Sequence, residues 1–490
     1  MKAVTPTLDI ELIKRKTISG IVTFTFRTFF IQIFTLFSTF ILTILLNPKV
    51  FGIFYLVSAI LNLFIYFSDI GLAAALIQRK EDPTKEDYST VFFLQQAIII
   101  TLVILGLLLS NKISAFYKLD ASSLLLFRIL IFSLFLSSLK TIPSIILERH
   151  LNFARLVVPQ IIENVTFYTV AMILAFYKFD LSSFTWAVLA RGVVGLIAVY
   201  IVSPWKPSLK FNYHKAKILT SFGVPFQLNS ILALLKDDLL TVFIGKILPI
   251  SEIGYIGWSQ KFAFIPLRFV MDNVIKVTFP SYSRLQHDIK ILKQAVDKSI
   301  FFVTFLVYPM LAGIMLVLPK LVKIIPNYQK WEPAVPLLLL FVVNAAFAAV
   351  NTTLTNVLFA IGKPKIILKL MVFWTILTWI FTYLLVKMLG FQGVALASAL
   401  VAASTTITVY FVKKEVDVSI FKNISIPLVS SLVMYAVLRI LNPFIPNSIF
   451  GIVLIIFFSM IVYFAIAFLM LGKKIIEDTQ TIFNVLRQKS

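Results

Sequence analysis

Long apolar stretches separated by short polar breaks make up almost the whole chain. Most of them reach the roughly 20 residues that an α-helix needs to cross a hydrocarbon layer about 30 Å thick. Strands of a transmembrane barrel would alternate polar and apolar residues, and these stretches do not. The pattern predicts an all-α, polytopic membrane protein with about 14 transmembrane helices. The predicted spans are 18–46, 53–78, 89–109, 122–147, 157–177, 183–203, 220–246, 254–281, 298–318, 334–361, 367–387, 391–412, 426–442 and 448–471.

The distribution of Lys and Arg predicts the orientation of these spans. Basic residues concentrate in alternate connections, and such connections stay on the cytoplasmic side of a membrane. We therefore expect a multi-pass protein of the cell (inner) membrane with both termini in the cytoplasm. Full crossing by 426–442 is left open, because that span is short and Pro443 and Pro446 follow it. The basic connections are 79–88, 148–156, 204–219, 283–298, 362–366 and 413–425.

Composition agrees with a lipid environment. Hydrophobic residues make up 59% of the 490 residues and charged residues 14%, where a soluble domain carries about a quarter. The net charge of +23 is spread over many short loops, which argues against a nucleic-acid partner. With zero cysteines, three histidines that all fall in predicted loops, and no phosphate-binding or metal-binding motif, the chain offers little for catalysis. We expect no metal, no cofactor and no enzymatic activity.

A weak internal repeat is visible along the chain. Residues 45–52 (LLNPKVFG) resemble 247–254 (ILPISEIG), and 187–190 lie at a similar offset from 395–398. Chance similarity between hydrophobic segments is the alternative. The repeat predicts an N-terminal six-helix lobe and a C-terminal six-helix lobe, followed by two additional helices and a tail. The predicted boundaries are 1–203, 204–412 and 413–490.

Ionisable residues inside the predicted spans are the candidate functional groups. Each costs about 2.5–3.5 kcal/mol at the centre of a membrane helix, so we expect it to face a cavity or a partner. Basic groups outnumber acidic ones, and a chamber that they lined would attract an anion. Internal salt bridging is the alternative for each residue. The predicted chamber cations are Arg27, Arg128, Lys140, Arg191, Lys236, Lys261 and Arg268, and the gating or ion-coupling candidates are Asp69, Glu163, Asp237, Asp238 and Asp272.

Two neighbouring spans concentrate these charges. Lys261, Arg268, Asp272 and Lys276 are spaced by 7, 4 and 4 residues, which places them on one face of a continuous helix. In the preceding span, the adjacent Asp237 and Asp238 are suited to bind a coupling ion, H⁺ or Na⁺, and equally suited to neutralise nearby cations.

Several segments resemble a known family. They are 45–52, 69–79 (DIGLAAALIQR) and 86–92 (EDYSTVF), supported by Glu148-Arg149 and Phe279-Pro280. These segments resemble the Wzx-type polysaccharide transporters of the MOP (multidrug/oligosaccharidyl-lipid/polysaccharide) superfamily. Lys49-Val50 replaces the acidic residue that is usual at the first turn. The resemblance extends over most of the chain and is most specific in the first hundred residues.

The resemblance implies two six-helix bundles that face each other in a V around a central cavity, with the last two helices appended. It also implies a flippase that moves a polyprenyl-pyrophosphate-linked oligosaccharide from the cytosolic to the outer leaflet by alternating access. Membrane lipids and a polysaccharide polymerase or export machinery are the implied partners. The products would be O-antigen, capsule or a related surface polysaccharide.

Two other functions stay open. An ion-coupled multidrug or metabolite antiporter of the same superfamily would favour an acidic cavity. A membrane-bound sugar or acyl transferase would need an essential carboxylate or histidine at a membrane face.

Overall fold

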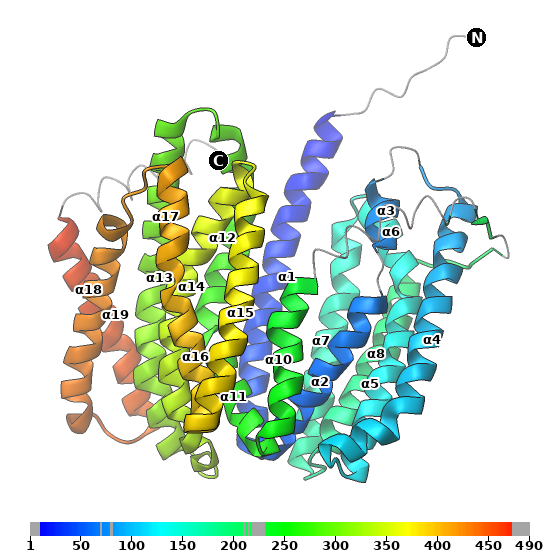
Figure 1. Ribbon diagram of the computed structural model, residues 1–490, viewed down its shortest axis with the longest axis horizontal. Helices are drawn as coiled ribbons and strands as arrows, with labels where there is room; N and C mark the ends of the chain where they lie inside the picture. Colours follow the sequence, from blue (N-terminus) through cyan, green and yellow to red (C-terminus); the bar gives the residue numbers. More distant parts are fainter. Residues whose placement is uncertain are drawn as a thin grey trace. The chain divides into compact units, whose positions relative to one another are not determined.

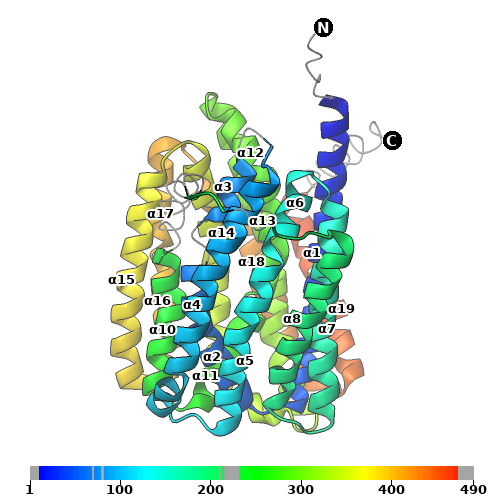
Figure 2. The same ribbon diagram turned by 90° about the vertical axis from the view of Figure 1, so that its right-hand side faces the viewer.

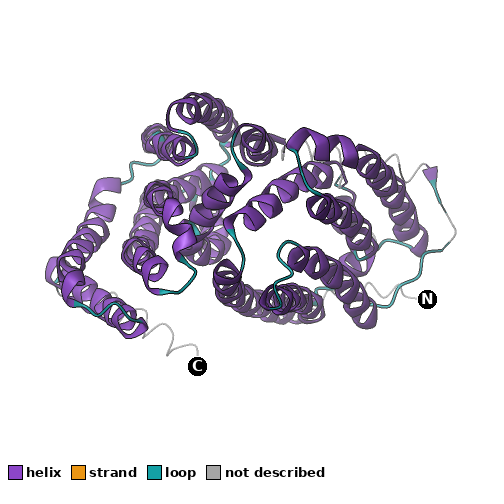
Figure 3. Cartoon of the chain, turned by 90° about the horizontal axis from the view of Figure 1, so that it is seen from below, coloured by secondary structure: helices purple, strands orange, loops and turns teal. Residues whose placement is uncertain are grey.

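The computed structural model describes residues 10–68, 71–78, 82–208, 211–213, 216 and 231–472. Every regular element over these residues is a helix, and none of the described segments forms a strand (Figure 3). This confirms the predicted all-α class. The chain divides into two compact units, Met1–Gly254 and Tyr255–Ser490. The three predicted domains stay predictions.

Within the described residues, 12 helices or helix pairs are long and apolar enough to cross a membrane. The protein is therefore a multi-pass membrane protein. Two further predicted spans are not among these 12. The span predicted at 220–246 corresponds to α10 (Ile231–Ile247), and its first residues lie outside the described residues. The span predicted at 254–281 corresponds to α11 (Ile250–Ala263) and α12 (Ile265–Leu285). The predicted count of about 14 thus agrees approximately with the structure.

The first unit contains the N-terminal helices together with α10 and the first turn of α11 (Figures 1 and 2). Helix α7 packs along both α1 and α8, and α10 packs along α2. The remaining helices of this unit are α1 (Ile10–Leu45), α2 (Pro48–Ser68), α3 (Leu72–Gln78), α4 (Lys85–Tyr117), α5 (Ala121–Leu139), α6 (Thr141–Arg149), α7 (Phe153–Phe176) and α8 (Ser182–Val202).

Helix starts in this unit follow from capping side chains. The hydroxyl of Thr84 accepts a hydrogen bond from the Asp87 N–H, and the Asp87 carboxylate accepts from the Thr84 N–H, which forms a capping box at α4. Asp120 caps α5 by accepting from the N–H of Ser123 at 2.8 Å and from its hydroxyl at 2.6 Å. These bonds satisfy amide groups that the helices leave free at their first turns.

The second unit contains the rest of α11 and the helices that follow. Helix α13 packs against α12, α14 and α18. The elements after α12 are α13 (Ile289–Ile324), η1 (Gln329–Ala334), α14 (Val335–Ala360), α15 (Pro364–Leu389), α16 (Gln392–Ala403), α17 (Thr405–Glu415), α18 (Ile420–Leu441), η2 (Asn442–Phe444) and α19 (Ile449–Leu471).

Polar contacts fix the last two transmembrane helices to α13 at both ends. Asp297 accepts hydrogen bonds from the Ser419 N–H at 2.9 Å and from the Asn423 side chain at 2.6 Å, next to the start of α18. At the other end, Lys320 is 6% exposed and donates to the Asn442 side chain at 3.0 Å and to the Ile445 carbonyl at 3.1 Å. The α18–α19 pair is therefore an integral part of the second unit.

Candidate functional site

Three predicted site residues meet inside the first unit, on three different elements. Lys140 lies between α5 and α6, Glu163 on α7 and Arg191 on α8. The Lys140 ammonium is 2.7 Å from one Glu163 oxygen, and Arg191 Nε is 3.8 Å from the other. We call Lys140, Glu163 and Arg191 the ionic triad. Since it contains two cations and one carboxylate, its formal charge is +1.

The break between α5 and α6 places Lys140. Pro143 has no N–H to donate to the Leu139 carbonyl one turn earlier, so the helix cannot continue regularly there. Instead, the Tyr200 hydroxyl of α8 donates to this carbonyl at 3.2 Å. The bond connects the break to α8, the helix on which Arg191 lies about two and a half turns before Tyr200.

A glycine provides the space for Glu163. A Cβ built on Gly195 of α8 would be 2.4 Å from both Cγ and Oε1 of Glu163. The carboxylate therefore lies against bare backbone. Pro159, one turn before Glu163 on α7, also lacks a helix hydrogen bond and lines the same region.

A cavity of about 260 Å³ adjoins the triad. Hydroxyl groups and an amide surround it together with Lys140 and Glu163. Gln160 Oε1 is buried and accepts no hydrogen bond from the residues that the structure describes, so it is available to a donor in the cavity. The lining residues are Ser137, Lys140, Thr141, Ser144, Leu156, Pro159, Gln160, Glu163 and Val199.

Burial separates the members of the triad. The Lys140 and Glu163 side chains are 13% and 15% exposed, whereas Arg191 is 54% exposed. A buried charged group depends on a close partner of opposite sign, which offsets part of its loss of solvation. Arg191 thus retains donors that Glu163 does not occupy, since a guanidinium carries five N–H groups.

A second polar group joins α2 and α10, also within the first unit. The Asn62 side chain donates to Asp238 at 2.8 Å, and Lys236 lies 3.8 Å from Asp237. This group is more open, because the Lys236 and Asp237 side chains are 39% and 70% exposed. The acidic pair is therefore divided: one carboxylate binds an amide and the other faces a lysine.

Arg128 lies apart from the triad. Arg128 on α5 donates to Ser110 at 3.2 Å and to Asn111 at 2.9 Å, both on α4. It precedes Lys140 by more than three helical turns. Arg27 is half-buried on α1. Asp69 lies outside the described residues.

The predicted charged face of the span at 254–281 is interrupted. Lys261 is half-buried near the end of α11, whereas Arg268 and Asp272 are exposed on α12. The helix breaks at Phe264, two residues before Pro266. Proline cannot donate to the preceding turn and restricts the residue before it, so the spacing of 7 residues no longer implies one face.

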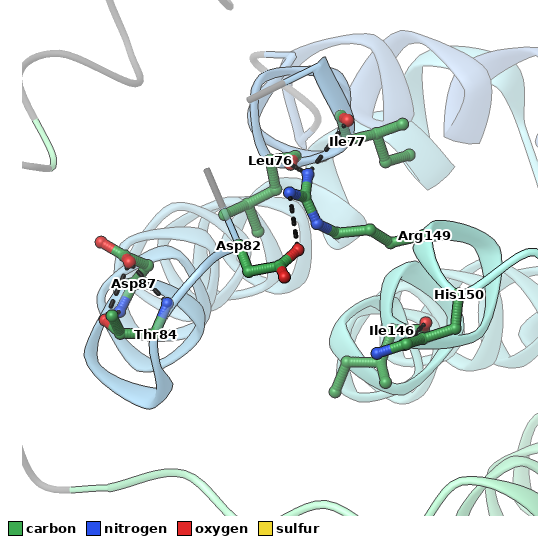
Figure 4. A network of polar contacts seen from close by, with 8 residues as sticks. All are labelled: Leu76, Ile77, Asp82, Thr84, Asp87, Ile146, Arg149 and His150. Carbon is green, nitrogen blue, oxygen red and sulfur yellow. Dashed lines mark hydrogen bonds and ion pairs between the residues drawn. The ribbon is translucent and has the colours of Figure 1, made fainter. Parts of the chain in front are cut away.

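One of the family-like segments, 69–79, contacts Arg149, the last residue of α6 (Figure 4). Its guanidinium donates to the carbonyls of Leu76 at 2.9 Å and Ile77 at 3.2 Å, and approaches Asp82 at 3.2 Å. A cation at the carbonyl end of a helix is stabilised by the exposed carbonyl groups, here those of α3.

The chain after α8 returns to the start of α4. The Ser208 N–H donates to the Ser89 hydroxyl at 2.8 Å. Asn212 donates to Thr90 at 3.1 Å and to Glu86 at 3.0 Å. The segment 86–92 thus holds the beginning of the connection that follows α8.

The candidate list did not include the hydroxyls around the cavity, Gln160 or Gly195. Their signals were present but weak. Gly195 follows Arg191 by four residues and Gln160 precedes Glu163 by three, so each lies on the same helical face as a charged candidate.

A family model described as "Polysaccharide biosynthesis protein" matches residues 41–336. The chain belongs to this family. The match covers more than half of the chain, including the ionic triad and the segments around Arg149. It confirms the resemblance that the sequence indicated.

Curated relatives are similar over much of the chain. The succinoglycan biosynthesis transport protein ExoT of Rhizobium meliloti is 24% identical over 67% of this chain and 66% of its own length. The lipopolysaccharide biosynthesis protein WzxC of Escherichia coli is 25% identical over 82% of this chain and 81% of its own. The chain thus spans slightly less than two thirds of ExoT.

A solved structure has the same fold. The lipid II flippase MurJ, in an inward closed conformation, matches with a TM-score of 0.74 and 17% identity. The match covers 93% of this chain and all (100%) of MurJ. At this identity, the match shows a shared fold.

Proposed function

We propose that this protein is a flippase that moves a polyprenyl-pyrophosphate-linked oligosaccharide from the cytosolic to the outer leaflet of the cell membrane. The transported unit would serve cell-surface polysaccharide biosynthesis. Family membership and the names of its relatives, a succinoglycan transport protein and a lipopolysaccharide biosynthesis protein, support this proposal. The protein acts without catalysis, and its partners are membrane lipids and a polysaccharide polymerase or export machinery.

The ionic triad is the observation that carries the proposal. Its formal charge of +1 lies among membrane helices, where an unbalanced cation is costly. An anionic group offsets that cost. Phosphate oxygens suit an arginine and a lysine, because a guanidinium binds them through two parallel hydrogen bonds and an ammonium attracts them as a point charge.

The size of the cavity limits what it holds. Pockets for drug-sized ligands have about 300–1,000 Å³, and this cavity has about 260 Å³. It accommodates a phosphate group or one polar end of the cargo. The polyprenyl chain stays in the bilayer, and the oligosaccharide occupies a larger basic central cavity that opens to each side in turn.

The remaining candidates have separate roles in this proposal. Arg27, Arg128, Lys236, Lys261 and Arg268 are further cations along the path of the headgroup. Asp69, Asp237, Asp238 and Asp272 act in gating or in coupling to H⁺ or Na⁺, and Glu163 of the ionic triad is a further candidate for this role. Both termini face the cytoplasm.

Deletion and complementation test the proposal. Deleting the gene should cause the lipid-linked precursor to accumulate in the inner leaflet, and the wild-type gene should reverse this. Arg191→Gln should lower flipping at least about tenfold, because a hydrogen bond to a charged group contributes about 1.5–3 kcal/mol. Lys365→Gln, an exposed lysine outside the candidate set, is the matched control.

The assay measures precursor on each side of the membrane and the amount of folded protein. Normal surface polysaccharide after deletion, in a strain without a second copy of the gene, would refute the flippase function. Equal loss of folded protein in Arg191→Gln would assign the triad a structural role instead.

The antiporter alternative is favoured by the acidic group on α10. Asp237 and Asp238 suit a cation, and they lie on a helix that packs against α2. Efflux of cationic dyes from proteoliposomes, abolished by Asp238→Asn, would support that function in place of flipping.

A further inference from the structure

Four exposed lysines gather at one end of the second unit. Lys298 lies in the third turn of α13, Lys413 and Lys414 lie in the last turn of α17, and Lys422 lies in the first turn of α18. The start of α13, the end of α17 and the start of α18 lie at the same end of this unit (Figure 1). We call Lys298, Lys413, Lys414 and Lys422 the basic rim.

A buried apolar core holds these helix ends together. Ile300 of α13, Val412 of α17 and Ile420 of α18 belong to one hydrophobic cluster, together with Val416 in the turn between the last two helices. Each lysine of the basic rim lies within two residues of a member of this cluster. The backbone positions of the four charges are therefore fixed relative to one another.

Helix lengths place the basic rim at the membrane surface. Helices α18 and α19 contain 22 and 23 residues, which gives a length of about 33–35 Å, close to the hydrocarbon thickness of about 30 Å. The start of α18 therefore lies at the level of the lipid headgroups. Asp297 accepts hydrogen bonds from the Ser419 N–H and the Asn423 side chain at this start, which brings its neighbour Lys298 to the same level.

The carboxylates among these helix ends already have partners. Asp297 accepts the two hydrogen bonds at the start of α18. A Glu415 oxygen lies 3.0 Å from the Lys363 ammonium, and an Asp417 oxygen lies 3.3 Å from the Lys293 ammonium. No lysine of the basic rim forms an ion pair with a residue that the structure describes. With these two paired lysines counted, six lysines face three carboxylates, and the formal charge is +3.

Apolar side chains accompany the basic rim. Phe421, beside Lys422, is 81% exposed, and Tyr410, one turn before Lys414 on the same face of α17, is 66% exposed. A phospholipid offers the matching pair of groups, because its phosphate attracts an ammonium and its acyl chains accept exposed rings. A water-soluble acidic partner would satisfy only the charges.

We propose that the basic rim is a docking surface for the headgroups of anionic phospholipids. Their phosphates bind the lysines, and their acyl chains lie along Phe421 and Tyr410. The distribution of Lys and Arg assigns this end of the unit to the cytoplasmic side, so these lipids belong to the cytoplasmic leaflet. The docking goes beyond the flippase function and does not depend on it.

Lipid titration of the purified full-length protein tests the docking surface. In a neutral detergent, phosphatidylglycerol should bind at least about tenfold more tightly than zwitterionic phosphatidylcholine, because each lysine near an anionic surface contributes about a factor of five in affinity. Native mass spectrometry counts the bound lipids. The thermal midpoint should also rise with phosphatidylglycerol, since a ligand of the folded state stabilises it. A variant that combines Lys298→Gln, Lys413→Gln and Lys422→Gln should lose this preference.

The matched control combines Lys112→Gln, Lys178→Gln and Lys323→Gln. It removes the same number of charges from exposed lysines that the predicted orientation assigns to the opposite side of the membrane. The control should keep the preference for phosphatidylglycerol. Both variants should fold, because substitutions of exposed residues without partners change stability little. A rim variant that keeps the full preference, or a control that loses it, would overturn the docking surface.

A second measurement uses the wild-type protein alone. Phosphatidylglycerol should protect the lysines of the basic rim from an amine-reactive label, located by peptide mass spectrometry, and should protect Lys112, Lys178 and Lys323 less. Phosphatidylcholine should protect neither set. Equal labelling of both sets in phosphatidylglycerol would refute the proposal, even if the rim variant does not fold.

Salt and inorganic phosphate identify the source of the anion. Raising the salt concentration should weaken the preference for phosphatidylglycerol, because exposed charges are screened. Inorganic phosphate at the concentration of the lipid should neither raise the thermal midpoint nor protect the basic rim. An equal effect of inorganic phosphate would assign the site to a free anion and overturn lipid docking.

Failure of this proposal and failure of the flippase function are distinguishable, because the lipid measurements require no transport. A protein that moves glycolipid but shows no preference for phosphatidylglycerol would refute the docking surface alone. A protein that shows the preference but moves no glycolipid would refute the flippase function alone.

Discussion

The ionic triad and the polar group around α10 (Asn62, Lys236, Asp237 and Asp238, here the α10 group) are two charged clusters of the same unit. They differ in the distances between their members and in how exposed these members are. In the triad, the charged atoms of Lys140 and Glu163 are 2.7 Å apart, and their side chains are only 13% and 15% exposed. In the α10 group, Lys236 and Asp237 are 3.8 Å apart and much more exposed. Both clusters were predicted as functional sites on the same argument of membrane cost.

Burial decides what each cluster can do. Two charges removed from water depend on each other, and deleting one leaves the other uncompensated. An exposed pair gains little from its partner, with a median contribution of about 0–1 kcal/mol. We infer that Lys140 and Glu163 support the fold and the cavity together, whereas Lys236 depends little on its pairing with Asp237.

Glu163→Gln should give the largest effect. It leaves Lys140 buried without a carboxylate, which costs about 3–5 kcal/mol of unfolding free energy. We expect a large fall in the thermal midpoint and in the folded fraction after detergent extraction, measured by thermal denaturation and size-exclusion chromatography.

A double variant separates charge balance from packing. Lys140→Met with Glu163→Leu removes both charges and keeps apolar volume, so most of the lost stability should return while flipping stays low. A Glu163→Gln protein as stable as the wild type would contradict the difference drawn between the two clusters.

Asp120→Ala should give an intermediate loss of stability, and the size of this loss should depend on pH. Asp120 lies between two spans, and hydrogen bonds from the Ser123 hydroxyl and N–H lower the pKa of this carboxyl below its usual value. Loss of the cap should cost about 1 kcal/mol at neutral pH. A lowered folded-state pKa means that this contribution is present above about pH 4 and disappears as the pH falls through the folded-state value.

The measurement compares thermal midpoints of wild type and Asp120→Ala between neutral and acidic pH. The difference between the two should shrink at the acidic end. A difference that grows on acidification would contradict this prediction. It would show that the protonated carboxyl of Asp120, rather than the carboxylate, stabilises the start of α5.

Lys236→Gln should give the smallest change in stability, within about 1 kcal/mol, because the pair with Asp237 is exposed. Flipping should nevertheless fall, since this lysine is proposed as a cation on the path of the headgroup. Folded protein and precursor flipping are measured on the same membranes, with Lys365→Gln as control. A variant that flips at the wild-type rate would remove Lys236 from the path.

The sequence alone predicted the elements of the fold well. Helices form through hydrogen bonds between residues four apart, and apolar length determines whether a helix crosses a membrane, so both properties can be read locally. The elements it described least well are α11 and α12, where a proline interrupts a face that spacing alone had joined. Charged residues also interrupt the apolar sequence of α10 and α12, at positions of functional interest.

Which residues meet was decided only by the tertiary structure. The sequence selected Lys140, Glu163 and Arg191 because each is costly in a membrane, but it could not tell that they share one cluster while Arg128 does not. Their meeting depends on Pro143, Tyr200 and Gly195, whose effects are expressed between helices. Likewise, the repeat indicated that Gly52 and Gly254 are equivalent, and only packing brought these glycines, 202 positions apart, into contact. Secondary structure follows from neighbours along the chain, whereas a site follows from which helical faces are buried against one another.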